Sequence, residues 1–186
     1  RSKKMQDLWN VAKKRPSGVW WYTVSIEEKL DESFIDFFRS RVSWINVSRY
    51  QNLSNGFIRR HADFVFWTTI CEYQNLNQNL IRDFRHRVNW DSVSRNQQLD
   101  TDFIREFSHM VTWRWISRFQ TFDQDFIREF EGMVEWNGIS QKKLDQDFIR
   151  EFKDRVNWEE ISFHQTLNES FIREFKNRVS WGHIFW

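Results

Sequence analysis

Serines and glutamines recur at fixed places along the chain, and a repeated serine is a residue type that could act as a nucleophile. The serines are Ser48, Ser94, Ser117, Ser140 and Ser162, and the glutamines are Gln51, Gln74, Gln97, Gln120 and Gln165. A serine nucleophile needs a neighbouring base, but no histidine or acid recurs at a suitable spacing. We therefore expect a structural role, in which small serines let helices approach closely and glutamines bond loop carbonyls of the next unit.

Histidine and cysteine are the residues that could hold a metal. The histidines are His61, His86, His109, His164 and His183, of which only the second and third share a repeat position. Two such ligands without a recurring cysteine or acid make a poor metal site, so we expect surface histidines and neither a metal nor a cofactor. Cys71 is the only cysteine, which excludes an intrachain disulfide and favours a reducing, intracellular compartment.

Arginine followed by an acid also recurs, and such a row could bind phosphates. The pairs are Arg82–Asp83, Arg105–Glu106, Arg128–Glu129, Arg150–Glu151 and Arg173–Glu174. The alternative is a lattice of exposed salt bridges that fixes the register of stacked units, each pair contributing about 0–1 kcal/mol. We expect the lattice, supported by helical pairs of Glu151 with Arg155 and of Glu174 with Arg178.

Aromatic residues outside the regular pattern are candidates for binding a partner. Tyr50, Tyr73, Phe119 and His164 each follow a regularly spaced Trp by six residues, and Trp115 breaks the polar habit of its position. These five residues could form an exposed aromatic ridge, since Tyr, Trp and Arg dominate binding hot spots. Packing between neighbouring units is the alternative interpretation.

Positive charge is concentrated at the N-terminus. Residues 1–18 hold six basic residues against Asp7, a net charge of +5, whereas the remainder holds 22 basic and 25 acidic residues. Any attraction for phosphate should therefore concentrate in the first helix or arm. The candidate nucleic-acid contacts are Lys3, Lys4, Lys13, Lys14 and Arg15.

The elements that position these residues follow from the spacing of tryptophan. Trp21, Trp44, Trp67, Trp90, Trp113 and Trp136 are each 23 residues apart, Trp158 follows after 22, and Trp181 after another 23. A fixed period of this length indicates a stacked repeat array. The missing residue falls in the loop before Leu144.

Each repeat is predicted to contain two helices of roughly eight to ten residues, which only their neighbours can stabilise. Good N-caps precede the first helix: Asp31, Ser54, Asn77, Asp100, Asp123, Asp145 and Asn168. The second helix has Ser43, Asn89, Thr112, Asn157 or Ser180 as its cap in five units, and the poorer caps Trp20, Phe66 and Glu135 in the others. Glu160 is expected to complete a capping box with Asn157.

The predicted fold is all-α: an α-solenoid of about seven 23-residue two-helix repeats. We expect residues 1–18 to form a basic N-terminal capping helix and loop, with Met5, Leu8, Trp9 and Ala12 on one side. Residues 19–186 are expected to form a single αα-repeat solenoid. No apolar run approaches transmembrane length. The chain begins at Arg1 rather than Met, which leaves open a targeting segment upstream.

The repeat consensus L-[DSN]-x-x-F-I-R-E-F-x-x-x-V-x-W-x-x-I-S-x-x-Q resembles short repeat proteins of giant DNA viruses of the marseillevirus and mimivirus kind. The matching residues extend from Val19 to Trp181, and the second unit departs most, with His61, Phe66 and Cys71. The resemblance implies a viral protein acting inside an infected host cell, in the cytoplasm or nucleus or packaged in the virion. It carries over no catalytic residues.

Three functions are consistent with these features. The sequence has no Gly-rich phosphate loop, HExxH motif or nucleophile elbow, so we expect a non-enzymatic scaffold that binds another protein along an extended face. The alternative is a nucleic-acid-binding protein that uses the basic N-terminus and the arginine rows. A third prediction is a homodimer formed through the apolar C-terminal residues Ile184, Phe185 and Trp186.

Overall fold

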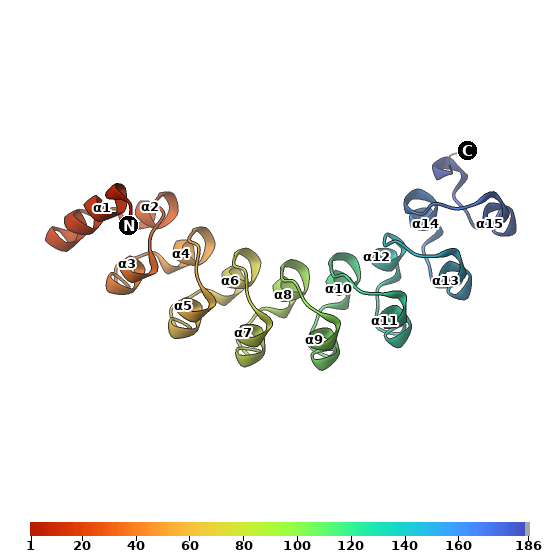
Figure 1. The fold of residues 1–186 in the computed structure, drawn as a ribbon, viewed down its shortest axis with the longest axis horizontal. Helices are drawn as coiled ribbons and strands as arrows, with labels where there is room; N and C mark the ends of the chain where they lie inside the picture. The colour runs from red at the N-terminus through yellow and green to blue at the C-terminus, as the bar shows by residue number, and fades with distance from the viewer. Residues whose placement is uncertain (185–186) are drawn as a thin grey trace. The chain divides into compact units, whose positions relative to one another are not determined.

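The computed structural model describes residues 1–184, and the chain divides into two compact units, residues 1–97 and 98–186. Residues 1–184 contain helices and no strand. Each unit is a stack of two-helix repeats, the arrangement of an α-solenoid, as predicted (Figure 1).

In the first unit, three helices begin the chain and the repeats follow. The helix α1 (Lys3–Lys14) and the short 3-10 turn η1 (Pro16–Gly18) precede α2 (Trp21–Glu27), the second helix of an incomplete repeat. The next elements are α3 (Glu32–Phe37), α4 (Trp44–Tyr50), α5 (Asn55–Arg60), α6 (Trp67–Tyr73), α7 (Gln78–Asp83) and α8 (Trp90–Asn96). The second helices α2, α4, α6 and α8 pack successively against one another.

The second unit continues the same alternation. Its elements are α9 (Thr101–Glu106), α10 (Trp113–Phe119), α11 (Gln124–Glu129), α12 (Trp136–Ser140), α13 (Gln146–Glu151), α14 (Trp158–His164), α15 (Glu169–Glu174) and the 3-10 turn η2 (Trp181–His183). Here α10 packs against α12, α12 against α14, and α14 against η2. The second helices therefore form a continuous row within each unit.

The repeat helices are shorter than the predicted eight to ten residues. The first helices have six residues and most second helices have seven, and α12 has five. The helical pattern stops at the second Phe of each repeat because the chain then continues in tight turns. In one repeat the carbonyl of Phe107 accepts hydrogen bonds from the N–H groups of both Met110 and Val111. Helices of this length depend on tertiary packing, as expected.

All seven predicted caps of the first helices are confirmed, because each side chain accepts a hydrogen bond from the backbone N–H three residues later. The second helices follow the prediction less well. Asn89 and Asn157 cap their helices, but Ser43, Thr112 and Ser180 make no such bond. Glu135, predicted to be a poor cap, accepts bonds from the N–H groups of Asn137 and Gly138.

The repeat tryptophans occupy equivalent surroundings. The indole N–H of Trp44 donates to the carbonyl of Arg39 at 2.8 Å, five residues earlier, and the same bond recurs at Trp21, Trp67, Trp90, Trp113, Trp136, Trp158 and Trp181. The rings contact the next repeat: Trp158 lies 6.1 Å from Phe171 and 4.9 Å from Phe175, measured between ring centroids. Each tryptophan therefore fixes the turn of its own repeat and covers the core of the next.

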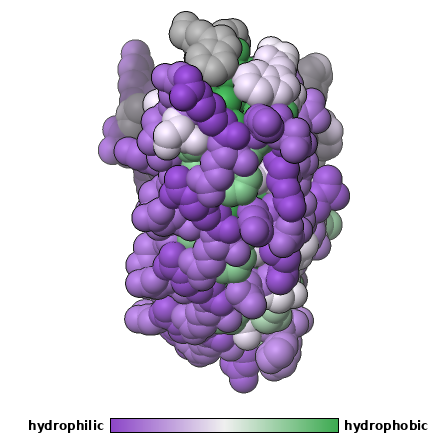
Figure 2. All heavy atoms as spheres, turned by 90° about the vertical axis from the view of Figure 1, so that its right-hand side faces the viewer, coloured by the Kyte–Doolittle hydropathy of each residue, from purple (hydrophilic) through white to green (hydrophobic). Residues whose placement is uncertain are grey.

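The buried core of each repeat is built from a small set of recurring apolar residues. The first Phe of the motif and the following Ile are almost fully buried, for example Phe148 and Ile149. Figure 2, which looks at the C-terminal side of the molecule, shows a mainly hydrophilic surface with small separate apolar patches. None of the helices described in residues 1–184 is both long enough and apolar enough to span a membrane.

Candidate functional site

The recurring glutamines form a polar ladder inside each stack. Gln51 donates from its side-chain nitrogen to the carbonyls of Ser25 and Glu28, both at 2.8 Å, and its oxygen accepts from the N–H of Leu30 at 2.9 Å. Gln74 makes the equivalent three bonds. The ladder was predicted, but its direction was wrong: each glutamine bonds the preceding repeat, because it lies at the end of a second helix packed on that repeat.

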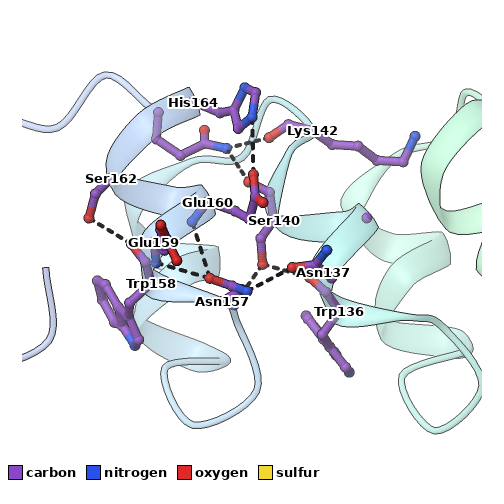
Figure 3. Close-up of polar contacts among 12 residues, drawn as sticks. Trp136, Asn137, Ser140, Lys142, Asn157, Trp158, Glu159, Glu160, Ser162 and His164 are labelled. Atoms are coloured by element: carbon purple, nitrogen blue, oxygen red, sulfur yellow. Dashed lines mark hydrogen bonds and ion pairs between the residues drawn. The ribbon is translucent and has the colours of Figure 1, made fainter. Parts of the chain in front are cut away.

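The recurring serines are bonded on both sides. The hydroxyl of Ser140 donates to the carbonyl of Trp136 at 2.6 Å and accepts from the N–H of Asn157 at 2.8 Å (Figure 3). Ser25 and Ser162 make the same pair of bonds. These serines therefore bridge successive second helices, a role beyond the close approach that was predicted, and their hydroxyls are committed to the scaffold.

The arginine row is the predicted salt-bridge lattice. The Nε atoms of Arg105, Arg128 and Arg150 lie 3.0, 3.0 and 2.9 Å from carboxylate oxygens of Glu129, Glu151 and Glu174, each in the next repeat. The predicted helical pairs with Arg155 and Arg178 are wrong. Both glutamates reach back to the preceding repeat, while Arg155 donates to the carbonyl of Glu131 and Arg178 pairs with Asp154.

His61 corrects the expectation that all histidines are on the surface. It is buried, with its ring 4.1 Å from that of Phe57, because it takes the place of the second Phe of its repeat. Its Nε2 lies 2.7 Å from Oδ1 of Asp36 and its Nδ1 lies 3.0 Å from the carbonyl of Phe57. The hydrogen bond from His61 lowers the pKa of Asp36.

The basic N-terminal residues are only partly available to a ligand. Lys4 pairs with Glu28 at 2.9 Å, and the Lys13 ammonium lies 4.9 Å from the centre of the Trp9 ring. Lys3, Lys14 and Arg15 are exposed. Trp9 also packs edge-on against Phe34, so that α1 covers the first complete repeat.

The predicted aromatic ridge divides into separate groups. In the first unit the guanidinium of Arg49 lies 5.1 Å from the ring of Tyr50 and 4.8 Å from that of Tyr73, and both tyrosines are about half exposed. In the second unit the rings of Trp115 and Phe119 stack at 5.8 Å. These contacts bring Tyr50 together with Tyr73, and Trp115 with Phe119.

His164 lies apart from the stacked pair, on α14. Its Nε2 is 3.1 Å from a carboxylate oxygen of Glu160, and its ring meets that of Phe163 edge-on at 4.8 Å (Figure 3). Glu160 is therefore used by His164, and the predicted capping box is wrong. Phe185 and Trp186, assigned to the predicted homodimer contact, lie outside the described residues.

The exposed positions of the second helices differ between repeats far more than the rest of the motif. They are the first, fifth and sixth positions after each repeat Trp, and we call them the variable face. In the first unit they are Tyr22, Ile26, Glu27, Ile45, Arg49, Tyr50, Thr68, Glu72, Tyr73, Asp91, Arg95 and Asn96. In the second unit they are Arg114, Arg118, Phe119, Asn137, Gln141, Lys142, Glu159, Phe163 and His164. Most are exposed, and only Ile26, Gln141 and Lys142 are half-buried.

The variable face of the second unit contains a shallow groove. One part, of about 300 Å³, lies between Arg114, Arg118 and Gln141 over Gly138, and an adjoining part, of about 450 Å³, extends to Glu159. Gly138 keeps the floor low: a Cβ there would lie 3.2 Å from the backbone nitrogen of Arg118. Most of this groove was missed from the sequence, although aligning the repeats and comparing the exposed columns would have found it.

Charge changes sign along this groove. Arg114 and Arg118 project from α10, whereas Glu159 and Glu160 belong to α14. The two arginines also lie over aromatic rings, Arg114 at 4.8 Å from Trp115 and Arg118 at 5.5 Å from Phe119. Among residues 1–184, no three His, Cys, Asp or Glu side chains are grouped so that they could hold a metal ion. The groove is thus suited to contacts with a charged and aromatic surface.

These features define the chain as an α-solenoid repeat protein. Comparison with protein-family models, curated proteins and solved structures finds no match to it. The resemblance to repeat proteins of giant DNA viruses stays a prediction.

Proposed function

We propose that the protein is a non-enzymatic repeat scaffold that binds another protein through the variable face. The observation that supports this most is where chemical variety occurs. The constant Ser, Gln, Trp and Arg–Glu positions bond neighbouring repeats, whereas the variable face ranges over aromatic, aliphatic, basic and acidic residues. Its setting inside an infected host cell stays a prediction from the resemblance.

The composition of the variable face supports a protein partner. Tyr, Trp and Arg are the residues most enriched at binding hot spots, because they bury a large area with few freely rotating bonds. Arg49 between Tyr50 and Tyr73 forms such a cluster in the first unit. Trp115 with Phe119 forms another in the second unit. In both clusters the side chains are held by one another before a partner arrives, which lowers the entropy lost on binding.

Repetition itself argues against a catalytic role. An active site requires unlike groups, such as a nucleophile, a base and a donor to a developing charge, converging on one pocket. The recurring serine hydroxyls instead lie between two backbone groups, as at Ser140 and Ser162. A long surface with a different set of side chains on each repeat is what solenoid proteins use to bind extended partners.

Affinity capture tests this proposal. The tagged chain and a variant with Tyr73, Trp115 and Phe119 changed to Ala are used to capture proteins from host lysate, with quantitative mass spectrometry as the readout. Proteins retained by the unchanged chain should fall at least about tenfold with the triple variant, a loss of about 1.4 kcal/mol in binding. Circular dichroism should show equal helicity, since these side chains are largely outside the core.

A matched variant separates this surface from the lattice face. Changing Arg105 and Glu129 together to Gln removes an exposed ion pair while keeping side-chain size, and should leave capture unchanged. Capture that survives the triple variant but is lost with the lattice variant would assign binding to the first helices and contradict the proposal.

Nucleic-acid binding is retained as a second candidate because Lys3, Lys14 and Arg15 are exposed around α1. The arginine rows offer less support, since Arg105, Arg128 and Arg150 are ion-paired. A gel shift in which the three exposed residues are changed to Gln tests it. Binding of this kind should weaken with rising salt, and the slope should decrease in the variant.

A further inference from the structure

Each glutamine of the ladder occupies a socket made by three backbone groups of the preceding repeat. For Gln74 these are the carbonyls of Ser48 and Gln51, at 2.9 and 2.6 Å from its nitrogen, and the N–H of Leu53, at 3.1 Å from its oxygen. Gln51 and Gln97 fill equivalent sockets. The socket thus recognises a primary carboxamide, which offers two donors and one acceptor in a fixed plane.

Gln165 shows that the socket tolerates a change in the loop. Here the nitrogen donates to the carbonyls of Ser140 and Lys142, and the oxygen accepts from the N–H of Leu144 at 3.1 Å. The same three bonds form although this loop is one residue shorter than the others. The carboxamide, rather than one particular loop sequence, is the constant part of the contact.

The C-terminal side of the second unit holds one more socket. Ser162, Gln165 and Leu167, the counterparts of the three socket residues, line a cavity of about 230 Å³ together with Phe163, Ile172 and Ile184. Within residues 1–184, no side-chain amide is hydrogen-bonded to these three backbone groups. The cavity is several times the volume of a water molecule, and apolar side chains complete its wall.

We propose that this terminal socket is a docking site for a helical segment of another protein that presents a glutamine, as a repeat of this type does. The arriving carboxamide would donate to the carbonyls of Ser162 and Gln165 and accept from the N–H of Leu167. Its aliphatic neighbours would pack on Ile172 and Ile184. A glutamate would fit poorly, because a carboxylate has only acceptors to set against two carbonyl oxygens. This site lies at the end of the stack and is separate from the variable face.

The partner is a different protein rather than a second copy stacked head to tail. In the first repeat Glu28 stands where later repeats carry the glutamine, and it is paired with Lys4 of α1 at 2.9 Å. The helix α1 also covers that repeat through Trp9, which packs on Phe34. The glutamines Gln51, Gln74 and Gln97 are buried in their own sockets. The N-terminal side of the chain therefore presents no carboxamide for the socket of another copy.

The amide resonance of Leu167 reports directly on the socket. The full chain labelled with ¹⁵N is titrated with a peptide copying residues 43–55, which contains Gln51, and with the same peptide carrying Glu at that position. The Gln peptide should shift the Leu167 resonance progressively and leave the filled-socket amides of Leu53, Leu76 and Leu144 unchanged. The Glu peptide should bind at least about tenfold more weakly.

A second measurement covers the case in which the short peptide does not form a helix in solution. The same segment is joined after Trp186 through a flexible linker, which raises its effective concentration at the socket. The Gln fusion should unfold at a higher temperature than the Glu fusion. Equal midpoints together with an unshifted Leu167 would overturn the proposal. A Leu167 shift that grows with protein concentration alone would overturn it as well, by showing that a second copy fills the socket.

Discussion

Cys71 stands where the other repeats carry the bridging serine, and the structure gives it the same place. It is fully buried at the end of α6, and the N–H of Asn89 hydrogen-bonds to its sulfur. Burial is the main cause that raises the pKa of this thiol to about 11 from its usual 9.0. Such a thiol is protonated at neutral pH, so we assign Cys71 a packing role rather than one in redox or nucleophilic chemistry.

The Cys71→Ser variant tests this assignment through the pH dependence of stability. Because the folded pKa is raised, the neutral thiol contributes stability that is fully present below pH 9 and is lost as pH rises toward 11. The free energy of unfolding of the unchanged chain should therefore fall relative to that of the variant by about 2 kcal/mol over this interval. Urea unfolding at several pH values measures it. Parallel curves would show that the thiol is solvated in the folded chain.

Residues fixed by local rules could be predicted, and exchanged residues could not. The caps at Asp31 and Asn168 follow from side-chain chemistry and the nearest backbone amides. The burial of His61 depends on Asp36, which replaces the usual Arg one repeat earlier and lies 2.7 Å away. Each of these two residues is anomalous alone, and only the stacking of their repeats shows that they compensate for each other.

At the scale of the elements, the repeat with the short loop shows how the ladder adapts. Lys142 replaces the glutamine there, and its ammonium donates to the carbonyl of Gln120. The same ammonium lies 4.5 Å from the centre of the Phe122 ring, and Phe122 in turn replaces the usual Leu. Burial lowers the pKa of Lys142. The lysine and the aromatic ring thus form a paired replacement that keeps a donor in the socket despite the missing residue.

The ladder predicts an asymmetry between two glutamines in the same unit and on its edge. Changing Gln74 to Leu should lower the free energy of unfolding by roughly 3–5 kcal/mol, because three buried backbone groups lose their partner. Changing Gln98, which is exposed in the next loop, to Leu should have an effect within about 0.5 kcal/mol. Chemical denaturation measures both. A similar small loss for the two variants would mean that water replaces the amide.

The existence of two helices per repeat could be predicted from the caps and the periodicity, but their ends could not. The apolar pattern continues from Phe103 through Phe107 to Val111, whereas the helix ends at Glu106. The continuing pattern belongs to tight turns that still point apolar side chains into the stack. The variable face was only partly predicted, because a binding surface lacks the regularity by which the scaffold was recognised.

At the scale of the molecule, the repeats are bonded almost entirely to their immediate neighbours. The ladder and the serine bridges connect each repeat to the one before it, and the lattice links consecutive first helices. Stability in such an array is approximately a sum over repeats and nearest-neighbour contacts. The period is therefore the quantity that must be kept, more than any single repeat.

Deleting one full period tests this view. Removal of residues 53–75, which takes out α5 and α6, joins Asn52 to Leu76 and keeps every later residue in register. We expect ellipticity per residue and a cooperative thermal transition to be retained. Removal of residues 53–64, about half a period, should abolish that transition because Trp67 then loses the turn that its indole N–H bonds. If both deletions behave alike, nearest-neighbour register does not determine folding.

The one-way direction of the glutamine contacts has a consequence for synthesis on the ribosome. A repeat that has just emerged holds two carbonyls and an amide that only the following repeat can saturate, as Gln74 does for Ser48, Gln51 and Leu53. Its completion thus trails translation by one period. Since α1 is made first and closes the opposite side, the nascent stack has a single growing edge, and a pause in elongation leaves that edge open to a chaperone.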